Sequence, residues 1–458
     1  MLNTPSKSLH PRWGRDIRSY PAIYTNKAIT GRLKVPVKAR DRAALRTIGL
    51  RAIEEICMLG NSKVESSEYN EIFESITLQK LESVLEFTRF PNEYENFAIP
   101  KLVAGCIELL SYTTPSPFAY EYGYLCFRIL VFALNTCFLK YAGAWEETVD
   151  EMQNKSSGLH TSCFWDRSAM VALEEVVYYG CEQAMSDAFD FVRSRRWSVP
   201  YFDQQKLDNL ISILHSDRKN FFIALRDTGS LGLSSLFFIL QRHIKSKQPK
   251  MEPAEFVEKI AVPFSRVFYR YQIVLPNFAM ERFASRHLFL GNLGDFTDTL
   301  LIDMDDSRNV LRAYINSVKP PHYRCEVFFG DGIPLNFLLP HVVPGCEDLI
   351  PGLFEAAMQV LWNALLDEDK RLQGLNHYVR LVMYHFHRLL DRLHEQVTSS
   401  RAIEDSWIYK LADKIVDNDV VGLILRAILL ELTPEPENLF YNQAGPRHII
   451  VGQLANNS

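Results

Sequence analysis

Three polar side chains in the C-terminal part of the chain have the spacing of a metal site. His387, Asp391 and His394 are separated by four and then three residues, so they share one face if this stretch is helical. Two imidazoles and one carboxylate can bind zinc or iron. The same spacing also arises when polar residues flank a buried apolar stripe, and the sequence offers no fourth ligand. We favour the second interpretation and expect no metal and no cofactor.

A second group, Asp303, Asp305 and Asp306, has the residue type that holds magnesium in nucleotide-handling enzymes. It stands where two helical segments are expected to meet, and Asp is favoured at the start of a helix, so we expect helix capping here. The sequence contains neither GxxxxGK nor GxGxxG, no GxSxG serine, and no cysteine flanked as in papain-like proteases. The sequence therefore predicts a protein that is not an enzyme.

The eight cysteines are too far apart in sequence for a zinc knuckle, and most lie among apolar residues. This pattern is typical of buried free thiols in a reducing compartment. The longest apolar run, residues 125–139, is interrupted by Arg128 and Asn135 and is too short to span a bilayer. The N-terminus also lacks the apolar core of a secretory signal. We expect no transmembrane segment and a location in the cytoplasm or nucleus.

The segment from Asp203 to Lys245 is the clearest sign of how the chain is built, because it predicts three short helices in succession. The first helix carries an apolar stripe of Leu207, Leu210, Ile211 and Leu214. Ser216 and Asp217 can cap the second helix, and Gly229 can end it in the left-handed conformation. The third helix carries a stripe of Leu233, Leu236, Phe237, Leu240 and Ile244. None of them can bury its apolar face without a neighbour, which is the physical basis of a helical repeat.

Residues 97–110, FAIPKLVAGCIELL, place a small residue, an aliphatic residue and Pro100 before a helix rich in Leu and Val. This pattern resembles the third-helix entry of armadillo repeats. The resemblance implies an all-α, right-handed α-solenoid of degenerate armadillo/HEAT-like repeats, with a groove that binds extended segments of other proteins. In that family the groove uses Trp and Asn on successive third helices. Here the matching residues are Asn135 and, much later in the chain, the neighbouring pair Trp362 and Asn363. For Trp362 we favour a role in core packing.

The charge is unevenly distributed, because Met1 to Arg51 carries a net charge of +10 and leaves −15 on the rest of the chain. This basic arm could bind nucleic acid or an anionic membrane, or it could fold back onto the acidic body. A third interpretation is a tail without a target. The residues that would carry the first interpretation are Arg32, Lys34, Lys38, Arg40 and Arg42.

The sequence predicts five regions: a flexible basic arm over 1–40, a helical-repeat region over 41–318, a Pro-rich connector over 319–352, a C-terminal helical region over 353–433 and a flexible tail over 434–458. One helix is expected from about Tyr69 to Phe90, and another from a cap at Asp166 to about Arg195. The function predicted from this organisation is a non-enzymatic helical scaffold that binds other proteins through a groove.

Overall fold

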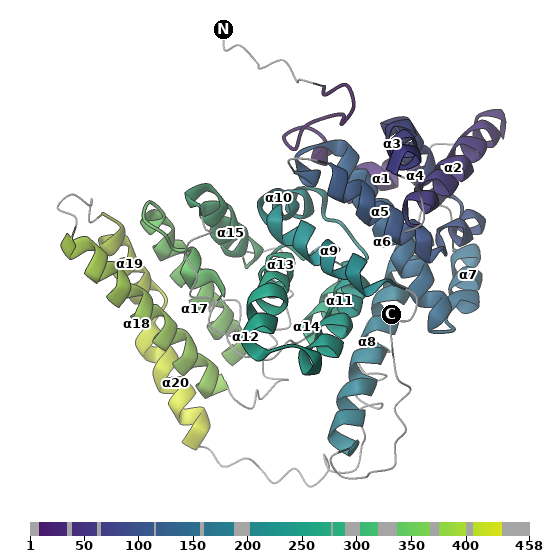
Figure 1. Ribbon diagram of the computed structural model, residues 1–458. Helices are drawn as coiled ribbons and strands as arrows, with labels where there is room; N and C mark the ends of the chain where they lie inside the picture. The colour runs from purple at the N-terminus through teal and green to yellow at the C-terminus, as the bar shows by residue number, and fades with distance from the viewer. Residues whose placement is uncertain are drawn as a thin grey trace. The chain divides into compact units, whose positions relative to one another are not determined.

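The computed structural model describes residues 9–33, 39–61, 66–113, 116–155, 160–186, 202–275, 278–288, 303–318, 337–366, 375–399 and 406–432. Within these ranges every regular element is a helix, and the only β-pairing is two isolated bridges. The predicted all-α class is therefore confirmed, whereas a solenoid of repeats stays a prediction. The chain divides into two compact units, Met1–Phe296 and Thr297–Ser458, which are described separately (Figure 1).

The helices of the first unit are mostly short, and they follow one another with few long connections. They are α1 (Asn26–Leu33), α2 (Ala39–Leu59), α3 (Ser66–Ser75), α4 (Leu78–Leu85), α5 (Pro100–Tyr112), α6 (Glu121–Tyr141), α7 (Trp145–Asn154), α8 (His160–Ser186), α9 (Gln204–Ser216), α10 (Arg218–Thr228), α11 (Leu233–Lys247), α12 (Pro253–Phe256), α13 (Val262–Ile273) and α14 (Ala279–His287). A π-turn over Val257–Ala261 joins α12 to α13.

The central helix of this unit is α6, which contacts α4, α5, α8 and α11. All residues from Glu121 to Thr136 are buried, and the ring of Phe132 packs on those of Phe97, Phe164 and Trp165. In the part of the chain that the structure describes, α6 is the one helix long and apolar enough to cross a membrane, but its apolar window is entirely buried inside the protein. A helix that is apolar on all sides is stable in this central position.

Residues 9–24 form a strap across the N-terminal end of α6. The backbone of the strap pairs with the segment before the helix, with Ile17 N donating to Ala119 O at 2.9 Å. Arg15 lies 2.6 Å from the fully buried carboxylate of Glu121, and the hydroxyl of Tyr24 donates to the same carboxylate at 2.7 Å. The strap therefore supplies two of the partners that make a buried acid tolerable.

The prediction of a flexible arm over residues 1–40 is wrong for this strap. Tyr20 is fully buried, and its hydroxyl donates to Phe118 O at 2.8 Å. The sequence of the strap lacks periodicity because the strap has little regular structure. The strap is nevertheless held in place by its contacts with the rest of the unit. Its contacts join residues about 100 positions apart, which local patterns do not reveal. Residues 1–8 and 34–38 lie outside the described ranges.

The three predicted helices between Asp203 and Lys245 are confirmed as α9, α10 and α11, with their apolar stripes buried. Gly229 ends α10 with φ of 62°, as expected for a left-handed C-terminal residue. The predicted side-chain cap of α10 is wrong, because neither Ser216 nor Asp217 provides one. The carboxylate of Asp217 accepts a hydrogen bond from Phe118 N at 2.8 Å instead, so it serves a distant segment.

The N-terminal end of α11 is held by a residue from another helix. Glu281 on α14 is fully buried and accepts hydrogen bonds from Leu233 N at 2.6 Å and Ser234 N at 2.8 Å. Tyr271 on α13 donates its hydroxyl to the same carboxylate at 2.6 Å. A carboxylate at this position satisfies free N–H groups and lies at the positive end of the helix dipole.

Two predicted helix boundaries in the first unit are wrong. The expected helix from Tyr69 to Phe90 is interrupted, since α3 ends at Ser75 and α4 starts after Thr77, whose hydroxyl accepts from Lys80 N. The expected cap at Asp166 is an interior residue of α8, which begins at His160. Both errors arise because apolar periodicity continues through positions where a cap or a turn changes the structure.

The second unit contains α15 (Met304–Ser317), α17 (Ile350–Leu366), α18 (Leu375–Ser399), α19 (Ser406–Asp417) and α20 (Val420–Leu432). Here α17 is central, because it contacts α15, α18, α19 and α20. Asp303 caps α15 by accepting from Asp306 N at 2.7 Å, which confirms the predicted capping role. Of the predicted connector, residues 337–352 contain short helical turns and the start of α17. Residues 319–336 and the tail from 433 lie outside the described ranges.

Candidate protein-interaction surface

The three candidate metal ligands lie on α18, and the structure describes two of their side chains. His387 Nε2 is 3.4 Å from Asp391 Oδ2, and both side chains are largely exposed. The side chain of His394 lies outside the described part of α18. Among the described residues, no group of three His, Cys, Asp or Glu side chains could hold a metal ion. The metal hypothesis therefore stays a prediction.

Asn135, one of the three predicted groove residues, is not available to a binding partner. It lies within α6 and is fully buried, and its amide donates to Val131 O at 2.8 Å and to Gly232 O at 2.9 Å. The amide thereby connects α6 to the turn before α11. This prediction is wrong because the sequence shows an Asn in an apolar helix but does not show which of its faces is covered.

The other two predicted groove residues are half-buried on α17 and make contacts within the second unit. Trp362 Nε1 donates to Asn418 O at 2.6 Å, and the guanidinium of Arg426 lies 5.0 Å from the centre of the indole rings. Asn363 donates to Gln359 O at 2.5 Å, one turn earlier in the same helix. The hydrogen bond of Trp362 thus holds the turn between α19 and α20 against α17, in keeping with the packing role that we favoured.

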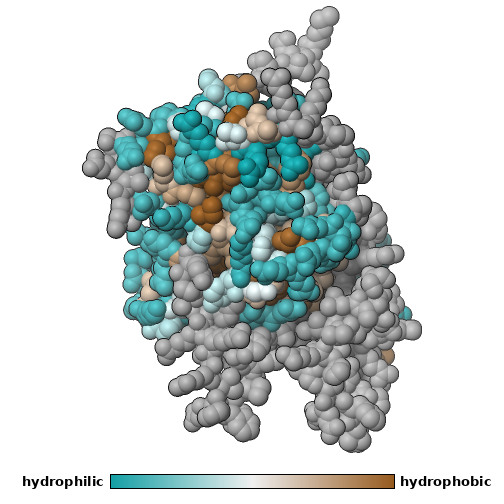
Figure 2. Space-filling view, turned by 90° about the vertical axis from the view of Figure 1, so that its right-hand side faces the viewer, coloured by the Kyte–Doolittle hydropathy of each residue, from teal (hydrophilic) through white to brown (hydrophobic). Residues whose placement is uncertain are grey.

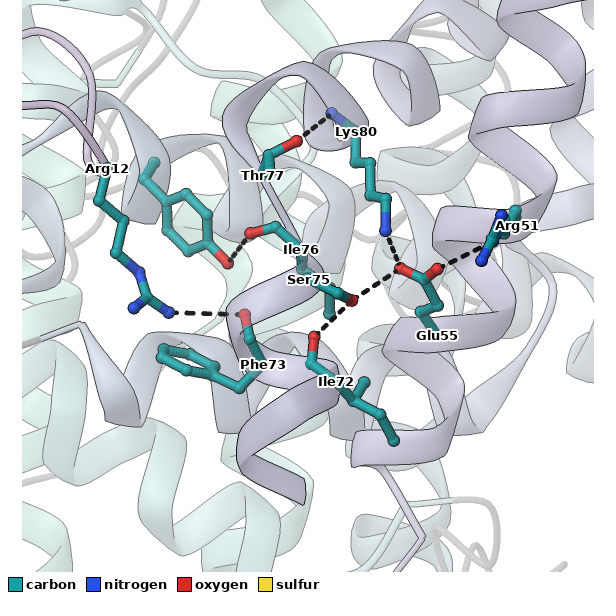
Figure 3. Close-up of polar contacts among 10 residues, drawn as sticks. Arg12, Arg51, Glu55, Ile72, Phe73, Ser75, Ile76, Thr77 and Lys80 are labelled. Atoms are coloured by element: carbon teal, nitrogen blue, oxygen red, sulfur yellow. Dashed lines mark hydrogen bonds and ion pairs between the residues drawn. The ribbon is translucent and has the colours of Figure 1, made fainter. Parts of the chain in front are cut away.

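Several cations of the basic segment contact acceptors of the same unit. Arg12 pairs with Glu74 and reaches the carbonyl of Phe73, and Arg51 pairs with Glu55, which Lys80 of α4 also contacts (Figure 3). Arg42 stacks on Phe90 at 3.9 Å and lies 4.0 Å from Glu93. These contacts agree with the interpretation in which basic residues fold back onto an acidic body.

The side chains of Arg32, Lys34, Lys38 and Arg40 lie outside the described part of the chain. An anionic partner for this segment therefore stays a prediction. If it is correct, the affinity for nucleic acid or anionic vesicles falls steeply as salt is raised.

Figure 2 shows the side of the molecule that carries α2, where hydrophilic residues dominate and hydrophobic ones form a narrow, interrupted band.

A different candidate surface lies on α19 and α20. The inner side of α19 carries Trp407 and Leu411, which are buried, and Lys414 donates to Glu355 of α17 at 2.8 Å. This hydrogen bond raises the pKa of the lysine. These contacts fix which side of α19 faces the unit and which side faces away from it.

The turn between the two helices sets the orientation of α20. Asp419 adopts φ of 42°, an uncommon conformation for a residue other than glycine, and its carboxylate accepts from Gly422 N at 3.1 Å. After this turn Val420, Leu423 and Ala427 are the buried residues, and α20 packs on α17 and α18. In Figure 1, α20 continues from α19 instead of folding back along it.

The outward sides of these two helices are apolar. In the part of the chain that the structure describes, seventeen large hydrophobic residues are exposed, and nine of them lie here: Ile408, Tyr409, Ile415, Val416, Val421, Ile424, Leu425, Ile428 and Leu429. The most exposed are Val416 at 79%, Tyr409 at 73% and Val421 at 69%. We call these nine residues the outer apolar face. Exposed large hydrophobic residues gathered in this way are a candidate for interaction with another protein or with a membrane.

Sequence analysis missed this face, although a signal was present. The sequence VVGLILRAILLEL of α20 is apolar on nearly all sides of the helix, as is expected of a helix that is covered all round. The structure covers only one side of it. No family model matches the chain, and no match was found among the curated proteins or among the solved structures. The resemblance to armadillo repeats therefore rests on the sequence patterns alone.

Proposed function

We propose that this protein is a non-enzymatic helical scaffold that binds other proteins, and that the outer apolar face of α19 and α20 is a binding surface. The observation that carries the proposal is the concentration of exposed large hydrophobic residues on two successive helices. Apolar side chains exposed to water contribute roughly 25 cal/mol per Å² when a partner covers them, so such a face favours association.

The composition of the face supports a protein partner over a bilayer. An interfacial membrane helix normally surrounds its apolar side with Lys and Arg, whereas the only basic residue described on α20 is Arg426. The α19 helix carries Lys410 and Lys414 together with Asp413 and Asp417, which leaves no excess of positive charge. The armadillo resemblance also implies a groove between repeats, which is a further part of the same proposal. Asn135 is not a contact in such a groove because it is fully buried.

The proposal is tested with a tagged full-length chain expressed in cells, cross-linked and captured, with co-captured proteins measured quantitatively. The test variant is Val416→Asp combined with Leu425→Asp, which places two charges on the outer apolar face. Both side chains are exposed, so we expect the variant to fold and to lose its bound proteins at least tenfold.

The matched control is Met58→Asp, which changes an exposed hydrophobic residue of α2 in the first unit. We expect this control to retain the proteins bound by the wild type. Equal capture by the wild type and the double variant would show that the outer apolar face is not the binding surface. Stoichiometric zinc or iron in the purified chain would instead support the enzyme hypothesis.

A further inference from the structure

The occupant of the outer apolar face can be inferred from the order of its residues along the two helices. On α19, Tyr409, Ala412 and Val416 are exposed and are separated by three and then four residues. On α20, Val421, Leu425 and Ile428 are separated by four and then three. These are the spacings of a helix that pairs with another helix along one apolar seam.

The two seams match each other when read in opposite directions. If α19 of one molecule lies antiparallel to α20 of a second, the layers formed are Tyr409 with Ile428, Ala412 with Leu425, and Val416 with Val421. In the middle layer the small residue Ala412 faces the large Leu425. Pairing a small residue with a large one allows helices to approach closely and fill the space between them.

The flanks of the two seams add a further contact. In an antiparallel pair the same flank of each helix faces the other, and Ile415 of α19 and Ile424 of α20 lie on corresponding flanks of their seams. They fall two residues from direct opposition, which is about 3 Å along the axis. The two-fold axis repeats this contact, so each interface contains it twice. Both residues belong to the outer apolar face.

The amount of apolar surface is also suitable for a stable pair. The nine side chains are each between 36% and 79% exposed, so together they present on the order of 800 Å², about what one partner contributes to an interface of standard size.

From these observations we infer that the outer apolar face binds a second copy of this chain, with a two-fold axis near Asn418 and Asp419 and with α19 of each copy along α20 of the other. The inference rests on the proposed function, and it names the partner of that same surface. Each copy would cover the apolar side that its own fold leaves exposed.

The test is the molar mass of the purified full-length chain, measured by light scattering across a range of concentrations. We expect a mass twice that of the single chain for the wild type and for Met58→Asp, and a single-chain mass for the double variant Val416→Asp, Leu425→Asp. Circular dichroism of each variant checks that the helices are retained.

The register is tested by an engineered charge pair in the middle layer. Ala412→Lys alone and Leu425→Asp alone should each weaken the dimer at least tenfold, and the combination of both in one chain should restore it. A wild type that stays a single chain at 100 micromolar or more, on the order of a weak complex, would overturn the inference. So would an unchanged dimer in the double Asp variant, or the absence of rescue by the combined substitutions.

The tests distinguish failure of the pairing from failure of the proposed function. A single-chain wild type that still captures proteins through residues 416 and 425 would refute the pairing and leave the scaffold proposal standing. A wild type that neither dimerises nor captures proteins through these residues would remove the two together.

Discussion

At the scale of single residues, the surroundings of a few acidic side chains in the first unit matter for the stability of the fold. Glu121 and Glu281 are fully buried with strong hydrogen-bond donors, whereas Asp166 is half-buried among other acids. Burial is the largest cause of the raised pKa of Asp166, followed by the charges of Glu151 and Glu281, with Lys155 acting in the opposite direction. These effects raise the pKa of Asp166 to about 6.

The first prediction concerns Asp166→Asn on α8. Because the folded pKa is above the unfolded value, the folded state holds its proton more tightly, and stability falls as pH rises from about 4 to about 6. Above pH 6 the ionised carboxylate destabilises the fold, so Asp166→Asn should raise the free energy of unfolding at pH 7.5 by on the order of 1 kcal/mol, after discounting for partial exposure. Urea unfolding at pH 7.5 and pH 4.5 measures the difference, which should shrink at the lower pH.

The control for Asp166 is Glu174→Gln, an exposed acid on the same helix. It should change the free energy of unfolding by less than about 0.5 kcal/mol at either pH. Equal stabilisation by both substitutions would mean that net charge, and not the surroundings of Asp166, is responsible.

The second prediction concerns Glu281→Gln. The substitution keeps the shape of the side chain but removes the charge that accepts hydrogen bonds from Leu233, Ser234 and Tyr271. Hydrogen bonds to charged groups are worth more than neutral ones, so the free energy of unfolding should fall by about 2 kcal/mol. Thermal and urea unfolding provide the measurement, with the exposed Glu54→Gln as a control that should be nearly neutral.

At the scale of elements, the strap of residues 9–24 is the contact that holds the N-terminal end of α6. Its ion pair, its Tyr24 hydroxyl and its backbone pairing all act on the segment between Phe118 and Glu121. A strap of this kind gains its stability from the helix that it covers, because it has almost no regular structure of its own.

The third prediction tests the strap through Arg15→Ala. Removing one partner of a buried ion pair leaves the other charge uncompensated, which typically costs about 3–5 kcal/mol. Since Arg15 is 42% exposed on its side chain and Tyr24 still donates to Glu121, we expect a smaller loss of about 1–3 kcal/mol in the free energy of unfolding. Arg18→Ala, an exposed position of the same strap, should be nearly neutral. A loss of similar size at Arg18 would contradict a specific role for Arg15.

At the scale of the whole molecule, the chain forms two compact units with separate central helices. The helix α6 draws its partners from residues 9–287, and α17 draws its partners from the second unit. The outer apolar face belongs to the second unit alone. The division therefore separates the largest buried core from the surface that we propose for binding.

The fourth prediction is that residues 1–296 fold without the second unit. Their core is enclosed by their own helices, so the fragment should retain a helical circular dichroism spectrum and unfold cooperatively. It should also stay a single chain in solution, because it lacks α19 and α20. A fragment that is insoluble or unfolds without cooperativity would show that the two units depend on each other.

The sequence by itself determined the helical class, the three helices between Asp203 and Lys245, the left-handed end at Gly229 and the cap at Asp303. These features depend on periodicity and on residues within one turn of each other, so they are written locally. The positions of the strap, of Asn135 and of Glu281 depend on partners 50 to 100 residues away. No local pattern encodes such partners.

The outer apolar face falls between these two cases. The sequence of α20 determined that the helix is apolar on most sides, but only the tertiary structure decided which side the protein covers itself. The physical reason is that one helix can be buried on one side by its own chain while the other side remains free for a second molecule. The sequence makes α20 apolar on most of its sides, and the fold determines which of those sides the chain itself covers.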